Sequence, residues 1–166
     1  MTFQSTESVK RNDCDFNLMK YEGHQLDESP LLALDIGLVS ACVLDSMHMV
    51  YIGITKKLLR TWMRGPKSVR LSAQQISVIS DKLVSLRRYI PQEFGRKPRA
   101  LSEIDRFKAS ELRQFLLYTG LVALKSVLET KFYNNFLNLS VAMFTLSSPK
   151  LVKHYADYSE SLLRYF

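Results

Sequence analysis

The sequence predicts an all-α protein, an irregular bundle of five to six helices with a poorly ordered N-terminal tail. Three observations carry this prediction. Apolar residues recur every three or four positions in several long segments. Only six glycines and five prolines interrupt 166 residues, so long segments can stay regular. The apolar fraction of 46% is enough for one domain with a hydrophobic core.

The first part of the chain carries no helical period. Residues 1–28 are polar, aperiodic and mixed in charge, so we expect a loosely ordered tail. The helical domain is expected to span residues 29–166, and it begins with the run LLALDIGLVSACVLD. That run is apolar without a clean period, so a buried irregular segment, a short strand and a helix all fit it.

Five later segments have the spacing of helices. Met47–Met63 carries an apolar stripe and ends before Gly65-Pro66, and a second helix follows Ser72 as its N-cap and ends at Pro91. Residues 121–132 give a short helical run, and residues 132–146 are apolar on nearly all sides, which predicts a buried central helix. The last helix, Lys150 to Phe166, places these apolar residues on one side: Leu151, Tyr155, Tyr158, Leu162 and Tyr165.

The segment from Leu101 to Gly120 is predicted to be a helix, capped by Ser102 with Asp105 and ended by Gly120. Lys108 and Glu111 fall in the middle of its apolar face. Buried charges are usually paired, so we favour a structural ion pair of Glu111 with Lys108 or with an arginine from residues 96–99. A catalytic acid is the alternative, because perturbed carboxylates collect at active sites.

The net charge of +7 is concentrated in the middle of the chain. Residues 56–113 hold 15 Lys and Arg against five Asp and Glu, whereas the rest of the chain holds eight against 11. This clustering favours contact with DNA or RNA phosphates, although a solvated face that keeps the domain soluble is the alternative. The candidate nucleic-acid-binding residues are Lys56, Lys57, Arg60, Arg64, Lys67, Arg70, Arg96, Lys97 and Arg99.

The candidates for metal and other chemistry are few. Asp45 and His48 have the Asp-x-x-His spacing of two ligands to one metal ion, but two ligands do not close a zinc site. Alternatively, Asp45 caps the following helix and His48 packs at its first turn. Two cysteines are too few for a disulfide framework, and no stretch suits a membrane span or a secretion signal. We therefore expect no membrane partner and a location in the nucleus or cytoplasm.

Several strings of the chain match one known family. LLALDIGLVSACVLDSMHMVYIGITKKLLRTWMRGP, RLSAQQISVIS, LRRYIPQEFGRKPRALSEIDRFKASELRQFLLYTG and YADYSESLLRYF together resemble animal transposon-encoded proteins related to the CACTA (En/Spm-like) DDE transposases. The resemblance covers roughly residues 29–166. It implies the helical insertion of a catalytic domain that resembles RNase H and holds Mg²⁺ with three carboxylates. Asp45-x-x-His48 resembles the family's [C/D]-x-x-H motif, half of a zinc-type site.

In such transposases the catalytic acids and the second half of the zinc-type site lie outside the matched region. The resemblance therefore implies a transposon-derived protein that is catalytically incomplete, is not an enzyme and has no cofactor unless missing zinc ligands come from elsewhere. We expect it to bind DNA backbone through its basic helical face, and to dock onto itself or a full-length transposase. The alternative is a helical interaction or oligomerisation module with no nucleic-acid role. A metal-dependent nuclease is the least favoured hypothesis.

Overall fold

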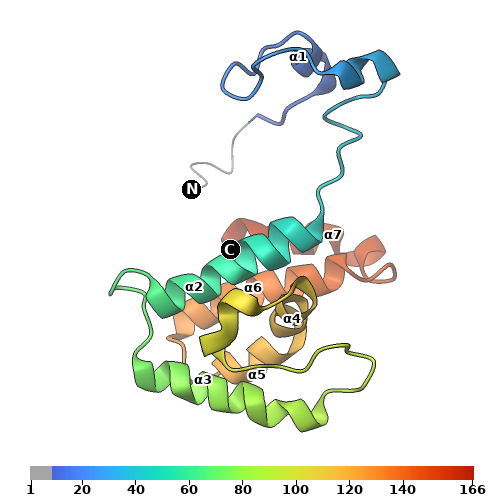
Figure 1. The fold of residues 1–166 in the computed structure, drawn as a ribbon. Coiled ribbons are helices and arrows are strands. Elements are labelled where there is room, and N and C mark those ends of the chain that lie inside the picture. The colour runs from blue at the N-terminus through green and yellow to red at the C-terminus, as the bar shows by residue number, and fades with distance from the viewer. Residues whose placement is uncertain (1–8) are drawn as a thin grey trace. The chain divides into compact units, whose positions relative to one another are not determined.

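The computed structural model describes residues 9–166, and all regular elements in that range are helical, which confirms the predicted fold class. The chain divides into two compact units, Met1–Asp45 and Ser46–Phe166 (Figure 1). This division falls between residues 45 and 46, whereas the boundary predicted from the sequence lies between residues 28 and 29. The two units are described separately below.

The first unit contains little regular structure. Its elements are α1 (Asp13–Asn17), capped by the side chain of Asn12, and the 3-10 helix η1 (Pro30–Leu34), capped by that of Ser29. The apolar run after residue 30 is mostly exposed, and Leu38 is its one buried residue among those described. The sequence left this run open between a buried irregular segment, a short strand and a helix, and the structure shows one 3-10 helix followed by mostly exposed irregular chain. Residues 1–8 of the predicted tail lie outside the described residues.

The second unit contains the helices that the periodicity predicts. A π-helix, η2 (Met47–Thr55), continues into α2 (Lys56–Arg64), and α3 (Ala73–Leu86) continues into the 3-10 turn η3 (Arg87–Tyr89). Ser72 caps α3 as predicted, because its hydroxyl accepts from the N–H of Gln75. Two helices, α6 (Thr130–Leu146) and α7 (Val152–Tyr165), close the unit.

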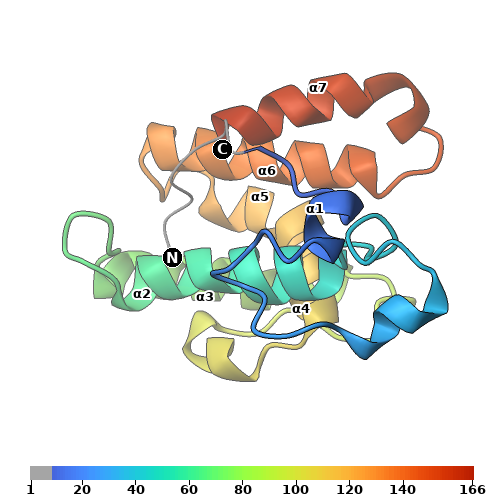
Figure 2. The ribbon, with the colours of Figure 1, turned by 90° about the horizontal axis from the view of Figure 1, so that it is seen from above.

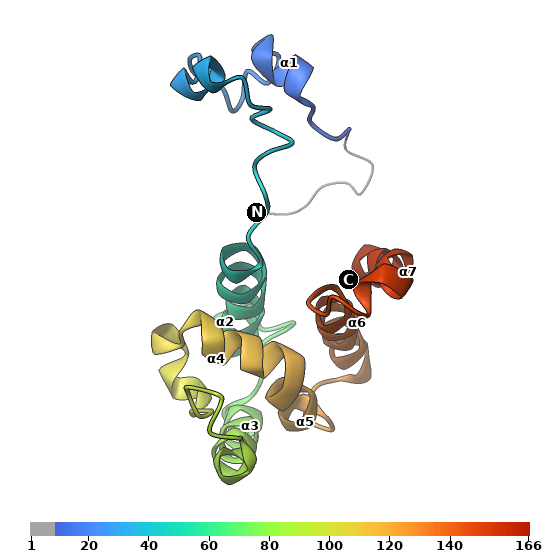
Figure 3. The ribbon, with the colours of Figure 1, turned by 90° about the vertical axis from the view of Figure 1, so that its right-hand side faces the viewer.

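The predicted helix over residues 101–120 was wrong at both ends. Residues Leu101–Arg106 form a separate 3-10 helix, η4, and the following helix begins at Ala109. That helix comprises α4 (Ala109–Gln114), the π-helical η5 (Phe115–Thr119) and α5 (Gly120–Leu124), so Gly120 does not end it. The predicted helical run over residues 121–132 is thus divided between α5 and α6. Figure 3 shows the α4–α5 helix lying between α2 and α3.

The core of the second unit forms around the α4–α5 helix and α6. The ring of Phe136 on α6 makes edge contacts with those of Phe115, at a centroid distance of 5.8 Å, and Trp62, at 6.0 Å. Phe136 is fully buried, whereas Phe144 and Leu146 of the same helix are exposed, so α6 is buried on one side and not on nearly all sides as predicted. The hydroxyl of Thr55 is buried in the same region without a hydrogen-bond partner among the described residues.

α7 packs along α6 as the outer helix of a hairpin (Figures 2 and 3). The face that it buries is not the predicted aromatic stripe, because Tyr155, Tyr158 and Tyr165 are exposed. Ser159 is fully buried instead, and its hydroxyl donates to the carbonyl of Tyr155 at 2.9 Å. A small residue lets the two helices approach closely, and the periodicity of large residues cannot reveal this.

Candidate nucleic-acid interface

On α2, apolar side chains face the core and basic side chains face the solvent. Leu59 and Trp62 are buried in the core, whereas Lys57, Arg60 and Arg64 are exposed. The loop after α2 folds back on it, because the N–H of Leu71 donates to the carbonyl of Trp62 at 2.8 Å. This loop carries the exposed Lys67 and Arg70. We call the six basic residues of this segment the α2 patch: Lys56, Lys57, Arg60, Arg64, Lys67 and Arg70.

One acidic residue of η4, Asp105, forms ion pairs with two arginines of the α2 patch. The carboxylate of Asp105 lies 2.8 Å from Nη2 of Arg60 and 2.9 Å from Nη2 of Arg64, and Nζ of Lys56 donates to the Asp105 carbonyl at 3.0 Å. Hydrogen bonds from the two guanidinium groups lower the pKa of Asp105 below its usual value. Asp105 therefore orients both arginines and offsets one positive charge, while their side chains stay 51% and 58% exposed.

The basic residues at positions 96–99 have different surroundings. The ammonium group of Lys97 donates to the carbonyl oxygens of Ile90 and Pro91 and so closes the end of η3. Arg99 is bound inside the unit, as described below. These internal partners occupy donors of Lys97 and Arg99, and contact of these two residues with nucleic acid stays a prediction. Arg96 remains exposed.

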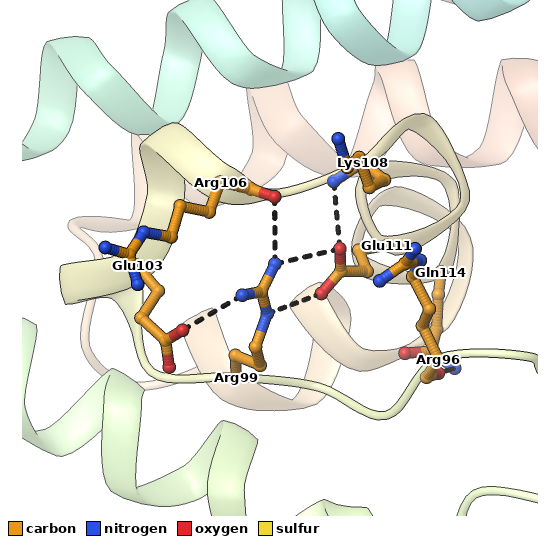
Figure 4. A network of polar contacts seen from close by, with 7 residues as sticks. All are labelled: Arg96, Arg99, Glu103, Arg106, Lys108, Glu111 and Gln114. Carbon is orange, nitrogen blue, oxygen red and sulfur yellow. Dashed lines mark hydrogen bonds and ion pairs between the residues drawn. The ribbon is translucent and has the colours of Figure 1, made fainter.

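The buried carboxylate of Glu111 is paired with Arg99 (Figure 4). Nε and Nη2 of Arg99 donate to the two carboxylate oxygens at 2.7 Å and 3.0 Å. Nη1 of Arg99 donates to Glu103 at 2.9 Å, and Nη2 donates to the carbonyl of Arg106 at 2.9 Å. The Glu111 side chain is 3% exposed and that of Arg99 is 25% exposed. The network ties the loop before η4 to the first turn of α4.

Lys108 takes a different part from the predicted one. Its main-chain N–H, and not its ammonium group, donates to Glu111 at 2.9 Å, which is a helix-capping contact. The ion pair therefore joins Glu111 to Arg99, as in the predicted alternative of an arginine from residues 96–99. Burial alone would raise the pKa of Glu111, but hydrogen bonds from Arg99 and from the Lys108 N–H hold that pKa below its usual value. The arrangement favours a structural carboxylate over a catalytic acid.

Asp45 and His48 lie on either side of the boundary between the two units, and both are exposed. Within residues 9–166, no group of three or more His, Cys, Asp or Glu side chains is arranged to hold a metal ion. The metal half-site therefore stays a prediction. The same range contains no helix that is long and apolar enough to cross a membrane.

Sequence reasoning missed two residues of this region. Asp105 was interpreted as part of a helix cap, and the order of residues gave no sign that it would meet Arg60 and Arg64, more than 40 positions earlier. Arg113 was counted only in the charge, although it lines a cavity beside Arg96. Arg113 directly precedes the buried Gln114 and lies one turn before the buried Leu117, so its place at the edge of the core follows from the helical period, but its place beside a cavity does not.

The distribution of charge follows the division of the chain. Residues 46–166 hold 20 Lys and Arg against eight Asp and Glu, a formal charge of +12, whereas residues 1–45 hold three against eight, a formal charge of −5.

Comparison of the chain with protein-family models, with curated proteins and with solved structures found no match in any of the three.

Proposed function

We propose that this protein is transposon-derived and binds the DNA backbone through the α2 patch. The observation that carries the proposal is the density of cations: six basic residues lie within 15 positions, all exposed or half-buried, on one helix and the loop that folds back on it. A helix of nine residues is about 13 Å long. Duplex DNA presents one phosphate about every 3.4 Å along each strand, so α2 can reach several phosphates.

The proposed mechanism is electrostatic. Each phosphate neutralised by a lysine or arginine releases a condensed counterion, and this release supplies most of the free energy of non-specific binding. Asp105 holds Arg60 and Arg64 in fixed positions, which reduces the conformational entropy that the two side chains lose on binding. Nothing in the patch suggests readout of base edges, so we propose binding without strong sequence preference.

The resemblance to CACTA-like transposases gives this binding a context. The matched strings include five of the six residues of the α2 patch, all but Lys67, and the resemblance places the catalytic acids in other segments of such proteins. We therefore propose binding alone as the role of residues 46–166, without strand cleavage. DNA is the proposed partner, with a transposase or a second copy of this chain as a further one, and the nucleus or cytoplasm is the proposed location.

Neutralising three of the six basic residues of the α2 patch should weaken DNA binding. In a Lys57→Gln, Lys67→Gln, Arg70→Gln variant of the full chain, we expect the affinity for duplex DNA to fall about tenfold or more at low salt. The slope of log affinity against log salt should become less negative by roughly 3, since about 0.9 counterions are released per contact. Fluorescence anisotropy with a labelled duplex measures both quantities.

The matched control removes three positive charges from α6, α7 and the turn between them. Lys131, Lys150 and Lys153 are exposed and lie on or next to α6 and α7, and their replacement by glutamine should change the affinity by less than about threefold. Equal losses in the two triple variants would contradict the proposal, because the binding would then follow net charge and not the α2 patch.

The exposed aromatic stripe of α7 favours self-association as a second candidate function. Tyr155, Tyr158 and Tyr165 are 52%, 55% and 80% exposed, and tyrosine is enriched in protein interfaces. We expect the sedimentation coefficient to rise with protein concentration, and a Tyr155→Ser, Tyr158→Ser variant to remove the rise. Tyr89→Ser, at an exposed tyrosine on η3, is the control. A wild-type protein that sediments as a monomer at every concentration would rule out this candidate.

A further inference from the structure

A cavity of about 160 Å³ lies between the loop before η4 and the start of α4, away from the residues of the α2 patch. Its walls are Glu93, Phe94, Gly95 and Arg96 from the loop, and Ser110, Arg113 and Gln114 from α4. Pockets for whole drug-sized ligands measure roughly 300–1,000 Å³, so this cavity suits a single small group.

The loop that forms one wall is held at several points. Lys97 donates to the carbonyls of Ile90 and Pro91, and Arg99 binds Glu111 on α4. The buried Gln114 donates from Nε2 to the carbonyl of Arg96 at 3.4 Å. The wall that carries Arg96 is thus fixed to the helix that carries Arg113, and a ligand would meet a cavity that is already formed.

Two arginines, Arg96 and Arg113, line this cavity. Within residues 9–166, neither Arg96 nor Arg113 forms an ion pair, whereas Arg60, Arg64 and Arg99 do. Figure 4 shows the Arg96 side chain beside Gln114. Its charge also contributes to the lowered pKa of Glu111.

The other cavity residues fit an anionic group on an organic carrier. Ser110 adds a hydroxyl donor, and the ring of Phe94 is held against that of Tyr118 at a centroid distance of 5.6 Å, which gives a fixed apolar wall. Glu93 is the one carboxylate of the lining, and it can accept from a hydroxyl group of the carrier. The two arginines and one carboxylate give the lining a formal net charge of +1.

We propose that this cavity binds a phosphate monoester group. A monoester carries about −1.5 to −2 charges at pH 7 and three acceptor oxygens, and arginine binds such groups with two parallel hydrogen bonds. The inference goes beyond the proposed function, because the site does not include the α2 patch and does not require a duplex. The group can belong to a strand end or to a free small phosphate.

The test is a titration of the full chain with sodium phosphate at constant ionic strength, followed by the Nε–Hε NMR signals of the arginines. We expect saturable shifts for Arg96 and Arg113 that sodium chloride does not produce. Arg113→Gln should weaken phosphate binding about tenfold or more, since hydrogen bonds to charged groups contribute about 1.5–3 kcal/mol. Arg87→Gln, at an exposed arginine of η3, should leave it unchanged. Shifts that do not saturate, or equal loss in both variants, would overturn the proposal.

Two short single strands, one with a 5′-phosphate and one with a 5′-hydroxyl, distinguish the sources. Tighter binding of the phosphorylated strand, lost in Arg113→Gln, identifies a strand end, and equal binding of the two together with saturable inorganic phosphate identifies a free phosphate. The Lys57, Lys67, Arg70 triple variant should keep its response to inorganic phosphate, so a failure of duplex binding and a failure of this cavity are separately visible.

Discussion

Replacing Arg99 with methionine is expected to destabilise the protein by about 2–4 kcal/mol. Removing one partner of a buried ion pair typically costs about 3–5 kcal/mol, because the other charge stays buried without compensation. We lower this range because Arg99 is 25% exposed, although Glu111 is only 3% exposed. Urea denaturation of the full chain at pH 7 measures the change in the free energy of unfolding.

The penalty in Arg99→Met should shrink as the pH falls. In the wild type the pKa of Glu111 lies below the unfolded value of 4.5, so its stabilisation is complete above that value and is lost as the pH falls through the folded pKa. Without Arg99, burial dominates and the folded pKa of Glu111 rises above 4.5. Ionisation of Glu111 then costs stability at neutral pH, and protonation near pH 4 relieves that cost.

Two controls separate this effect from general disruption. The double variant Arg99→Met, Glu111→Gln should recover much of the stability, because the neutral amide can still accept from the Lys108 N–H. Arg164→Met breaks an exposed pair with Glu160, whose side chains are 61% and 64% exposed, and should cost less than about 1 kcal/mol. A penalty in Arg99→Met that is small and independent of pH would contradict the structural role of the network.

Gly120→Ala is expected to destabilise the protein by about 1–3 kcal/mol, the usual cost of overpacking a core. The same change in an open helix interior stabilises by up to about 1 kcal/mol. Here a Cβ atom would lie 2.5 Å from the carbonyl oxygen of Phe115 and 3.0 Å from Cζ of Phe136. Neither can move easily, because the first is π-helix backbone and the second is fully buried. The midpoint of thermal or urea unfolding measures the change.

Gly95→Ala is the matched control for Gly120→Ala. A Cβ atom at Gly95 would meet nothing within 4 Å, and no described glycine has a positive φ. This change should therefore be neutral or should stabilise the protein by up to about 1 kcal/mol, through the lower entropy of the unfolded chain. The two substitutions are expected to have opposite signs, and a stabilising Gly120→Ala would show that the helix does not pass so close to Phe136.

Periodicity predicted the parts of the fold where large apolar residues face the core. The helices that begin near Met47, Ala73 and Thr130 appear where their stripes place them, because burial of those stripes drives each helix to pack. The same reasoning recognised that Glu111 would be buried and paired, and it included arginine from residues 96–99 among the partners.

The rest depended on contacts that no local pattern contains. Gly120 was interpreted as a helix end, but it lies inside a helix where a Cβ atom would meet the carbonyl oxygen of Phe115 and the ring of Phe136 from another helix. Ser159 marks the buried face of α7 through its small size, whereas the periodicity followed the large tyrosines. Arg99 is paired with Glu111, 12 positions later, and Arg60 is paired with Asp105, more than 40 positions later. A count of basic residues therefore overstates the positive charge available to phosphate.

The most direct test of the account is the salt dependence of duplex DNA binding by the wild-type chain. Six cations of the α2 patch, less the charge offset by Asp105, predict that log affinity falls linearly with log salt with a slope of about −4 to −5. Affinity that does not change with salt, or no binding even at low salt, would contradict the proposal that residues 56–70 contact the DNA backbone.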